Sequence, residues 1–205
     1  MTWQKRDKRL RVLAEGLVKA GALQFGTYTL PDGSESSYYI NLRGVASYPG
    51  LYGLVVEALA DLARKKAPKV DAICGIPMTG LALAAPVAVA LKKPLVYTRV
   101  MRQADDRVVE GEVRPDWDVL PVDDLSTSGK TVLACAKALE QEGGEATKAI
   151  VLIDRLEGAR ERLSKQGITL HSVTDVMELA DTLASMELIS DENIKAIARS
   201  VGRRQ

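Results

Sequence analysis

The stretch Val122-Asp123-Asp124-Leu125-Ser126-Thr127-Ser128-Gly129-Lys130-Thr131 decides the fold class, because it joins an apolar segment to two acids and a hydroxyl-rich turn. It ends in Gly-Lys-Thr, as the P-loop of nucleotide triphosphatases does. A P-loop also requires a glycine where the backbone wraps the β-phosphate, five positions before the glycine of Gly-Lys-Thr. Asp124 occupies that position, and a carboxylate there would repel phosphate. The sequence therefore argues against an ATP or GTP site of this kind.

The same stretch predicts another kind of anion site, at a turn between a strand and a helix. Hydroxyls and backbone N–H groups from Ser126 to Thr131 would face a phosphate at a helix N-terminus, where the helix dipole also favours an anion. The paired acids Asp123 and Asp124 suit sugar hydroxyls, a bound Mg²⁺ or a developing positive charge. A 5-phosphoribosyl group satisfies both requirements. The alternative is an ordinary capped turn, which rarely needs two acids and four hydroxyls.

Strand-like and helix-like segments alternate from Val70 onward. The expected strands are 70–74, 94–100, 118–122, 149–153 and 169–173, and the expected helices are 81–91, 129–141, 158–165, 176–186 and 191–203. This order predicts an α/β fold with a mostly parallel central sheet flanked by helices. Ligands of such sheets bind beyond the carboxyl ends of the strands, where the strand order switches. Segments 75–80, 123–129 and 154–158 are therefore expected to rim one crevice.

The first fifty residues do not follow this rhythm. A helix over 7–20, ended by Gly21, precedes strands over 24–30 and 37–41 around a Pro31-Asp32-Gly33 turn, and Pro49 opens a helix to Lys66. We expect a single domain over 1–205, with a hood and N-terminal helix over about 1–48 and the core and C-terminal helices over about 49–205. Pro121 lies inside a predicted central strand, so a bulge or a position without an N–H partner is expected there.

The composition excludes several classes of protein. The chain has 205 residues, of which 46% are hydrophobic, so it can bury a sizeable core. A net charge of +1 gives no support for a nucleic-acid partner, and no apolar run reaches the length of a membrane span. Cys74 and Cys135 match no metal spacing and are expected to be buried thiols of a reducing compartment. These features predict a cytoplasmic protein, with a structural role for His171.

The segment from Val122 to Gly129 resembles the signature by which type I phosphoribosyltransferases bind 5-phosphoribosyl 1-diphosphate (PRPP). The resemblance extends over nearly the whole chain to the orotate phosphoribosyltransferases, and most of all to the form fused into two-domain UMP synthases. The stretches that resemble the family are 25–43, 74–80, 109–111, 151–155 and 167–172. Within the superfamily, the resemblance is to the orotate branch in particular, because of segments 25–43 and 152–155. It implies a type I phosphoribosyltransferase fold with a small N-terminal hood.

The resemblance also implies an activity, which is the Mg²⁺-dependent transfer of the 5-phosphoribosyl group from PRPP to orotate. The products would be orotidine 5′-monophosphate and diphosphate, in pyrimidine biosynthesis, and the enzyme would be a homodimer. Its transition state would resemble an oxocarbenium ion, so that catalysis rests on positioning and charge stabilisation. Two alternatives remain open: a phosphoribosyltransferase for another base, and a non-catalytic protein that binds PRPP or a nucleotide.

The family's functional residues map onto three sets in this chain. The catalytic set is Arg99, Arg102, Asp123 and Asp124. The PRPP-binding set is Pro77, Met78, Thr79, Gly80, Asp123, Asp124, Leu125, Ser126, Thr127, Ser128, Gly129, Lys130 and Thr131. The orotate-binding set is Tyr38, Tyr39, Thr127 and Arg155, in which the Arg155 guanidinium would pair with the orotate carboxylate. No direct side-chain ligand for Mg²⁺ is expected, because PRPP would carry the ion and Asp123 and Asp124 would reach it through water. The alternatives are a hairpin core for the tyrosines and a surface ion pair for Arg155.

Two segments depart from the family's pattern. Pro31 stands where the motif Phe-x-Leu-Lys-Ser-Gly has its lysine. The segment 99–110, which aligns with the mobile catalytic loop, has no lysine, and Asp105 and Asp106 stand where the family has cations and glycine. Arg102 is not a neutral replacement for a lysine at a point-charge site. A lost charge contact to diphosphate would cost on the order of 10²–10³ in rate.

Overall fold

The computed structural model describes residues 3–29, 35–99 and 108–202. The expectations for Pro31, for Arg102 and for most of the segment 99–110 lie outside these residues. Contacts within the chain divide it into two compact units, one made of Met1–Leu54 with Thr174–Gln205 and the other of Val55–Val173. Each unit is described by itself below. Within the described ranges, no helix is both long enough and apolar enough to cross a membrane.

The larger unit is built on a six-stranded sheet with the strand order β5-β4-β3-β6-β7-β8. Its strands are β3 (Ala72–Gly75), β4 (Leu95–Thr98), β5 (Val109–Glu110), β6 (Val119–Ser126), β7 (Lys148–Asp154) and β8 (Thr169–Asp175). β3 pairs in parallel with β4 and β6, and β6 pairs in parallel with β7. Only the short β5, which was not predicted, is shown to run antiparallel, along β4. The predicted mostly parallel α/β sheet is confirmed, and the strand order switches at β3.

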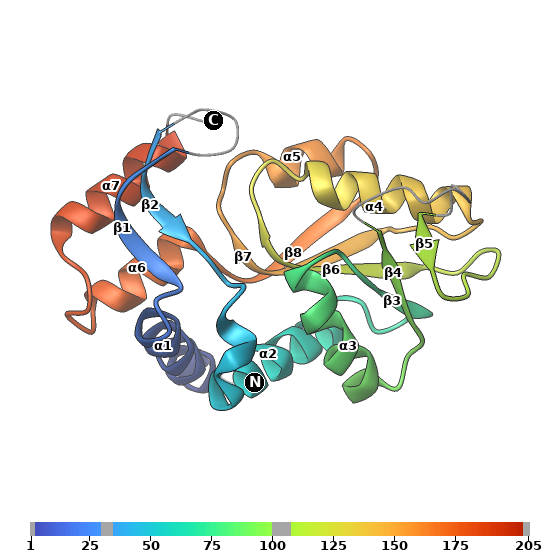
Figure 1. Ribbon diagram of the computed structural model, residues 1–205, viewed down its shortest axis with the longest axis horizontal. Coiled ribbons are helices and arrows are strands. Elements are labelled where there is room, and N and C mark those ends of the chain that lie inside the picture. Colours follow the sequence, from blue (N-terminus) through green and yellow to red (C-terminus); the bar gives the residue numbers. More distant parts are fainter. Residues whose placement is uncertain (1–2, 30–34, 100–107, 203–205) are drawn as a thin grey trace. The chain divides into compact units, whose positions relative to one another are not determined.

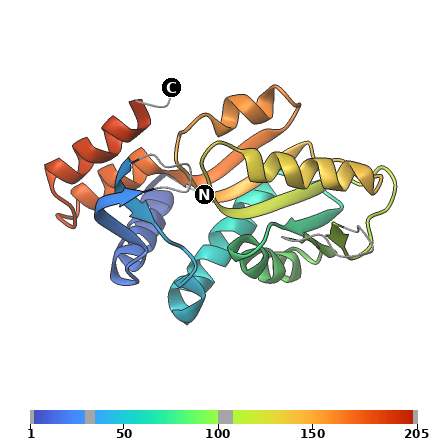
Figure 2. The same ribbon diagram turned by 45° about the horizontal axis from the view of Figure 1, so that its top comes forward.

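Helices cover both faces of this sheet. The helices of the unit are α3 (Thr79–Leu91), α4 (Lys130–Gln141), α5 (Ala159–Ser164) and the later part of α2 (Pro49–Lys66). α4 and α5 lie on one face, and α2 and α3 lie on the other (Figures 1 and 2). With helices on both sides, β7 buries every residue after Lys148, which is why it reads as a continuous apolar run up to Asp154.

Two thiols lie together in the core between the sheet and α4. Cys74 of β3 and Cys135 of α4 are both free and buried, and their Sγ atoms are 3.5 Å apart. Burial beside Cys74 raises the pKa of the Cys135 thiol well above its ordinary value, because the hydrogen bond with Cys74 and the apolar surroundings both disfavour the thiolate. The expectation of buried thiols is confirmed.

The smaller unit combines the two ends of the chain. Its elements are α1 (Trp3–Lys19), β1 (Leu23–Thr29), β2 (Glu35–Ile40), a short 3-10 helix η1 (Val45–Ser47), α6 (Val176–Ala184) and α7 (Asp191–Gly202). β1 and β2 form an antiparallel hairpin, α7 packs on β2, and α6 packs on α1 (Figure 1). The C-terminal helices were expected with the core, whereas their contacts group them with the N-terminal residues.

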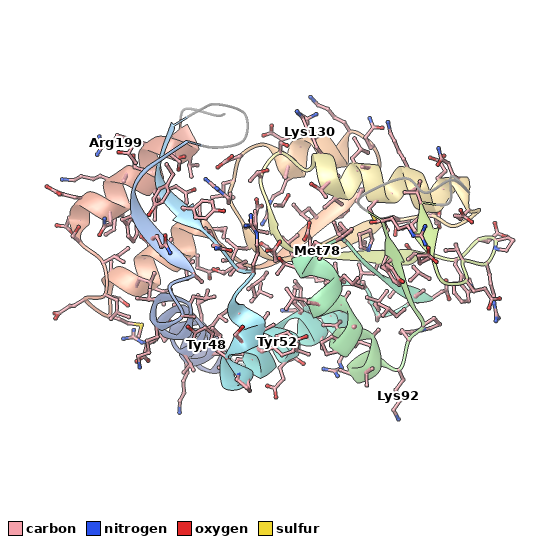
Figure 3. The ribbon with its side chains drawn as sticks, in the orientation of Figure 1. Tyr48, Tyr52, Met78, Lys92, Lys130 and Arg199 are labelled. Atoms are coloured by element: carbon pink, nitrogen blue, oxygen red, sulfur yellow. The ribbon has the colours of Figure 1, made fainter. Side chains whose placement is uncertain are left out.

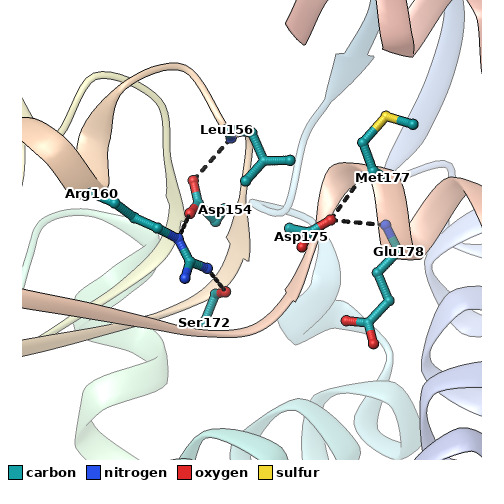
Figure 4. A network of polar contacts seen from close by, with 7 residues as sticks. All are labelled: Asp154, Leu156, Arg160, Ser172, Asp175, Met177 and Glu178. Atoms are coloured by element: carbon teal, nitrogen blue, oxygen red, sulfur yellow. Dashed lines mark hydrogen bonds and ion pairs between the residues drawn. The ribbon is translucent and has the colours of Figure 1, made fainter. Parts of the chain in front are cut away.

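Both C-terminal helices begin at side-chain caps. Asp175 accepts hydrogen bonds from the backbone N–H groups of Met177 and Glu178 at 3.0 and 2.8 Å, which starts α6 (Figure 4). Ser190 caps α7, since its Oγ accepts from Asn193 N at 3.3 Å while Asn193 Oδ1 accepts from Ser190 N at 3.1 Å. Ser190 thus lies just before the first residue of α7, in the position where serine is a preferred cap.

β6 is longer than predicted. The sequence suggested a strand ending at Val122, but pairing with β7 continues through Asp123 to Ser126. Pro121 lies opposite Cys74 in the ladder with β3, and that ladder shows no register shift, so no bulge accompanies it. Pairing with β7 holds β6 extended through Asp123 to Ser126, residues that rarely favour strands on their own. The two acids therefore belong to the strand and not to the loop.

Candidate active site

The acid pair occupies the last part of β6, where the backbone fixes both side chains. Asp123 lies opposite Val151 of β7 and is only 8% exposed. The backbone N–H of Asp124 donates to Asp123 Oδ1 at 2.9 Å, and the N–H of Leu125 donates to Asp124 Oδ1 at 2.9 Å. Each carboxylate is thus tied to the next peptide along the strand.

No positively charged side chain among the described residues compensates the charge of the acid pair. Burial raises the pKa of Asp123 well above its ordinary value of 3.8, and the charge of Asp124 raises it further. No lysine or arginine among the described residues forms an ion pair with either carboxylate. Hydroxyl donors or a cation brought by a ligand would relieve this unfavourable charge, which is the chemistry expected for a ribose or a hydrated metal ion.

The loop between β3 and α3 lies directly against the acid pair. A Cβ atom placed on Gly80 would lie 2.7 Å from both Asp123 Oδ1 and the carbonyl oxygen of Val122, so only glycine fits at this point. The peptide bond between Pro77 and Met78 is cis. Met78 is 77% exposed at the start of α3, where Figure 3 labels it. Of the residues predicted to bind diphosphate, Gly80 therefore adjoins Asp123.

The turn from Ser126 to Gly129 leads from β6 into α4. Gly129 has φ of 75°, and a Cβ atom there would lie 3.2 Å from Ala159 Cα, so the turn requires glycine for both conformation and space. No side chain caps the first N–H groups of α4. Ser126 Oγ is buried and finds no hydrogen-bond partner within the described part of the chain. Uncapped N–H groups next to an unpartnered hydroxyl favour an anion.

The basic residue of this turn is more exposed than the hydroxyl residues that precede it. Lys130 is exposed on the first turn of α4, where Figure 3 labels it, and Thr131 is also exposed. Thr127 and Ser128 are partly buried. Backbone groups and hydroxyls therefore dominate this turn, in contrast to a P-loop, in which the lysine is a phosphate contact.

A rigid turn follows β7. Asp154, which is 1% exposed, accepts from Leu156 N at 2.9 Å and from Arg160 Nε at 2.5 Å. Arg160 Nη2 donates in turn to Ser172 Oγ on β8 at 3.0 Å (Figure 4). Leu156 has φ of 58° and Gly158 has φ of 87°, so the backbone reverses sharply between them. This clamp, which was not predicted, fixes the residues between Asp154 and Gly158.

Arg155 lies inside this turn and is 3% exposed. Its backbone N–H donates to the carbonyl oxygen of Ser126 at 2.9 Å, which joins the turn to the end of β6. Its Nε atom is 3.0 Å from Glu157 Oε1, and both side chains are 4% exposed. The sequence also allowed a surface ion pair as the role of Arg155. The ion pair exists, but it is buried. Glu157 was not singled out from the sequence.

These contacts bring the three predicted segments together. Gly80 meets Asp123, Ser126 meets Arg155, and Gly129 meets Ala159. The expectation that the three strand ends share one edge of the sheet is confirmed by these contacts. Asp123 is therefore next to the loop that ends at Gly80, and the end of β6 is next to the turn that holds Arg155.

Arg99 stands at the edge of the described residues, just after β4. Its N–H donates to the carbonyl oxygen of Val108 at 2.8 Å, and its guanidinium forms an ion pair with Glu110. Val108 and Glu110, on the far side of the segment 100–107 in the sequence, thus both contact Arg99. Arg102 belongs to that segment, and its assignment remains a prediction.

The two tyrosines predicted to flank the base differ in environment. Tyr38 is fully buried in the smaller unit, which fits the hairpin-core alternative for this residue. Tyr39 is partly buried, and its ring stacks on that of Tyr28 with centroids 5.4 Å apart. Arg43 Nη2 donates to the Tyr39 hydroxyl at 3.5 Å. Of the two residues, only Tyr39 is partly exposed.

A metal held by protein side chains alone has no site in the residues that the structure describes. No cluster of three or more His, Cys, Asp or Glu side chains is placed to hold an ion there. A divalent cation at the acid pair would need ligands from a bound molecule or from water.

Known proteins are similar to this chain in sequence and in fold. Residues 46–181 match the family model of the phosphoribosyl transferase domain. The chain is 34% identical to the uridine 5′-monophosphate synthase of Bos taurus over 197 residues, which cover 95% of this chain and 41% of that protein. It is 35% identical over 185 residues to the orotate phosphoribosyltransferase of Cenarchaeum symbiosum, covering 88% of this chain and 92% of that protein.

A solved structure agrees with these matches. The structure of Leishmania donovani UMP synthase superposes with a TM-score of 0.86 at 30% identity, covering 94% of this chain and 42% of that one. The chain therefore spans less than half of the two UMP synthases and nearly all of the archaeal protein.

Proposed function

We infer the function from the family, since the chain belongs to the phosphoribosyltransferases and, among them, to the orotate phosphoribosyltransferases. It transfers the 5-phosphoribosyl group of PRPP to orotate, giving orotidine 5′-monophosphate and diphosphate. The observation that carries this proposal is the acid pair of β6, which runs directly into the uncapped turn before α4. Acids and anion-binding groups in that order match a ribose that carries a 5′-phosphate.

The residues around the acid pair would bind the two ends of PRPP. Asp123 and Asp124 would accept hydrogen bonds from the ribose hydroxyls, and the turn from Ser126 to Thr131 would donate N–H and hydroxyl groups to the 5′-phosphate. The diphosphate would lie along the backbone of the loop that ends at Gly80. Their adjacency supports these roles, because Gly80 and Ser126 both adjoin the acid pair.

The base would be recognised by a carboxylate contact and by stacking. Arg155 would bind the orotate carboxylate through its guanidinium, with Thr127 near the edge of the ring. The partial burial of Tyr39, in contrast to the complete burial of Tyr38, supports Tyr39 as the stacking residue.

The protein's contribution to the reaction is positioning and charge. As the bond from C1 to diphosphate breaks and the bond to orotate forms, positive charge develops on the ribose. Asp123 and Asp124 would stabilise that charge, and they have no cation of their own among the described residues. Mg²⁺ brought with PRPP would neutralise the diphosphate, and Asp123 and Asp124 would reach the ion through water.

We propose that the active form is a homodimer and that it works in the cytoplasm. α3 contains no charged residue, and Val89 on this helix is 79% exposed. An exposed apolar helix is typical of a surface that another chain covers. Sedimentation analysis of the purified chain would show a species of twice the chain mass; a monomer at all concentrations would contradict the dimer.

One observation favours the alternative of a phosphoribosyltransferase for another base. Arg155 is already paired with Glu157, so its charge is partly neutralised before a carboxylate binds. The alternative of a non-catalytic protein rests on the lysine-free segment 99–110.

One assay separates the three. The chain is incubated with PRPP, Mg²⁺ and orotate, and in parallel with uracil and with purine bases, while the absorbance of each base is followed. The proposal expects consumption of orotate that depends on PRPP, and loss of that activity in Asp124→Asn but not in Glu140→Gln, an exposed acid of α4. Turnover of another base in preference to orotate supports the second function. PRPP binding without turnover of any base supports the third.

A further inference from the structure

The ion pair between Arg155 and Glu157 is unusual in being fully inside the protein. Its Nε–Oε1 distance is 3.0 Å, and both side chains are 4% exposed. Burying two charges costs desolvation that their attraction only partly recovers, so such a pair adds little to stability compared with apolar residues. A buried pair at a ligand site therefore calls for an explanation in terms of binding.

The turn holds Glu157 in place. Asp154 accepts from Leu156 N, and the left-handed conformation of Leu156, with φ of 58°, reverses the chain between Arg155 and Glu157. Arg160 Nε donates to the other carboxylate oxygen of Asp154, Oδ2 (Figure 4). The carboxylate of Glu157 is therefore part of a fixed turn, close to the guanidinium that the proposed function assigns to the orotate carboxylate.

This placement puts two carboxylates in competition for one cation. A guanidinium has five N–H donors, so Arg155 can contact Glu157 and a ligand carboxylate at the same time. The two carboxylates would then repel each other in surroundings of low dielectric, where repulsion over a few ångströms is strong. A base without a carboxylate escapes that repulsion.

We propose that Glu157 is a specificity-determining residue for the base, because its charge limits how strongly Arg155 attracts a carboxylate. The inference rests on the proposed function and deepens it. Glu157 sets the preference for orotate over uracil, which has the same ring without the carboxylate, and it keeps that preference lower than Arg155 alone would make it.

The test compares Glu157→Gln with wild type, using the full chain at saturating PRPP. Glutamine has nearly the same shape and keeps an oxygen that accepts from Arg155 but removes the charge. The KM for orotate is expected to fall by about tenfold, while the KM for uracil and the KM for PRPP stay within about twofold. Glu161→Gln is the matched control, because Glu161 is an exposed acid in the first turn of α5, and it is expected to change neither base.

Two outcomes overturn the inference. An unchanged or higher KM for orotate in Glu157→Gln would show that the charge does not compete with the substrate. A parallel change for orotate and uracil would show a general effect on the fold. If wild type turns over no base, the proposed function fails and this inference fails with it; if wild type turns over orotate, only the assignment of Glu157 is at stake.

A second measurement needs no variant. A site whose buried polar groups are left unpaired by an analogue rejects it by about 10⁴–10⁵ in kcat/KM. Glu157 keeps Arg155 paired when uracil binds, so wild type is expected to prefer orotate over uracil by less than about 10³. A preference of about 10⁴ or more would contradict the proposal even if Glu157→Gln failed to fold.

Discussion

Gly80 and Asp123 stand so close that a methyl group does not fit between them. A Cβ atom on Gly80 would lie 2.7 Å from Asp123 Oδ1 and 2.9 Å from Asp123 Cα. The first turn of α3 is therefore pressed against the strand that carries the acid pair, and the loop from β3 takes its position from that contact. The loop proposed to bind diphosphate and the acid pair proposed to bind ribose are in this way one packed unit.

Replacing Gly80 by alanine should damage the site more than the fold. The added methyl group must push α3 away from backbone atoms of β6, which costs about 1–3 kcal/mol of stability. Displacement of the loop by a fraction of an ångström is expected to lower kcat/KM for PRPP by about 10²-fold. Gly53→Ala is the control, because a Cβ atom there meets nothing within 4 Å, and it should leave activity unchanged. Equal activity of the Gly80→Ala variant and wild type would contradict the importance of this contact.

Replacing Asp123 by asparagine should stabilise the unliganded chain while destroying activity. The pKa of Asp123 is raised above 3.8 by burial and by Asp124, so the folded chain holds the proton more tightly than the unfolded chain. The stability from this group is complete below 3.8 and is lost as pH rises through the raised folded-state pKa. Asparagine keeps an oxygen for the N–H of Asp124 and has no charge to bury.

Thermal melts of the unliganded chain across pH test this sign. The Asp123→Asn variant should melt higher than wild type near neutral pH, by about 2–4 °C for each kcal/mol, and the difference should shrink as pH falls. Its rate should drop by about 10²–10³. Glu140→Gln, on the exposed side of α4, should show no such trend. If the melting temperatures of wild type and Asp123→Asn differ by the same amount at every pH, burial of the Asp123 charge is not what lowers the stability of wild type.

The sequence predicted the framework well where local signals and packing agree. Pro49 marked the start of α2, and the alternation of apolar strands with helices gave the parallel sheet. It failed at the end of β6, because Asp123, Asp124 and Ser126 have little strand propensity and are held extended only by pairing with β7. The strand order, which places the three ligand segments at one edge, follows from long-range pairing that a local pattern does not contain.

Side-chain environments were the hardest to predict. Glu157 follows a loop and is two residues from a basic residue, so the sequence suggests a solvated charge, whereas the Asp154 clamp buries it beside Arg155. Tyr38 and Tyr39 are neighbours of one type, and only the hairpin decides that Tyr38 is buried and that Tyr39 stacks on Tyr28. The sole available signal was the alternation of faces along a strand, which does not say which face is the core.

The thiols of Cys74 and Cys135 should be inert in the folded chain. Both are buried, and the raised pKa of Cys135 keeps it protonated, whereas the thiolate is the reactive form. Ellman's reagent should therefore detect almost no thiol in the native protein and both thiols after denaturation in guanidinium. Fast reaction of the native protein would show that the core around β3 and α4 opens readily. Failure to detect both thiols after denaturation without reductant would reveal a disulfide.

The clamp made by Asp154 should matter for base binding as well as for stability. Asp154→Ala removes the acceptor for Leu156 N and the partner of Arg160, and loss of buried hydrogen bonds to a charged group costs about 1.5–3 kcal/mol. Asp154→Asn keeps an oxygen for Leu156 N and loses only the charge opposite Arg160, whose side chain is 52% exposed, so its cost should be below about 1 kcal/mol. Because the turn also places Arg155, the alanine variant should raise the KM for orotate by about tenfold and leave the KM for PRPP nearly unchanged. Denaturant unfolding measures the loss of stability in both variants, and steady-state kinetics measure the two KM values. A similar loss of stability in both variants would show that the clamp does not act through the turn. An equal rise of the KM for orotate and the KM for PRPP in Asp154→Ala would show the same.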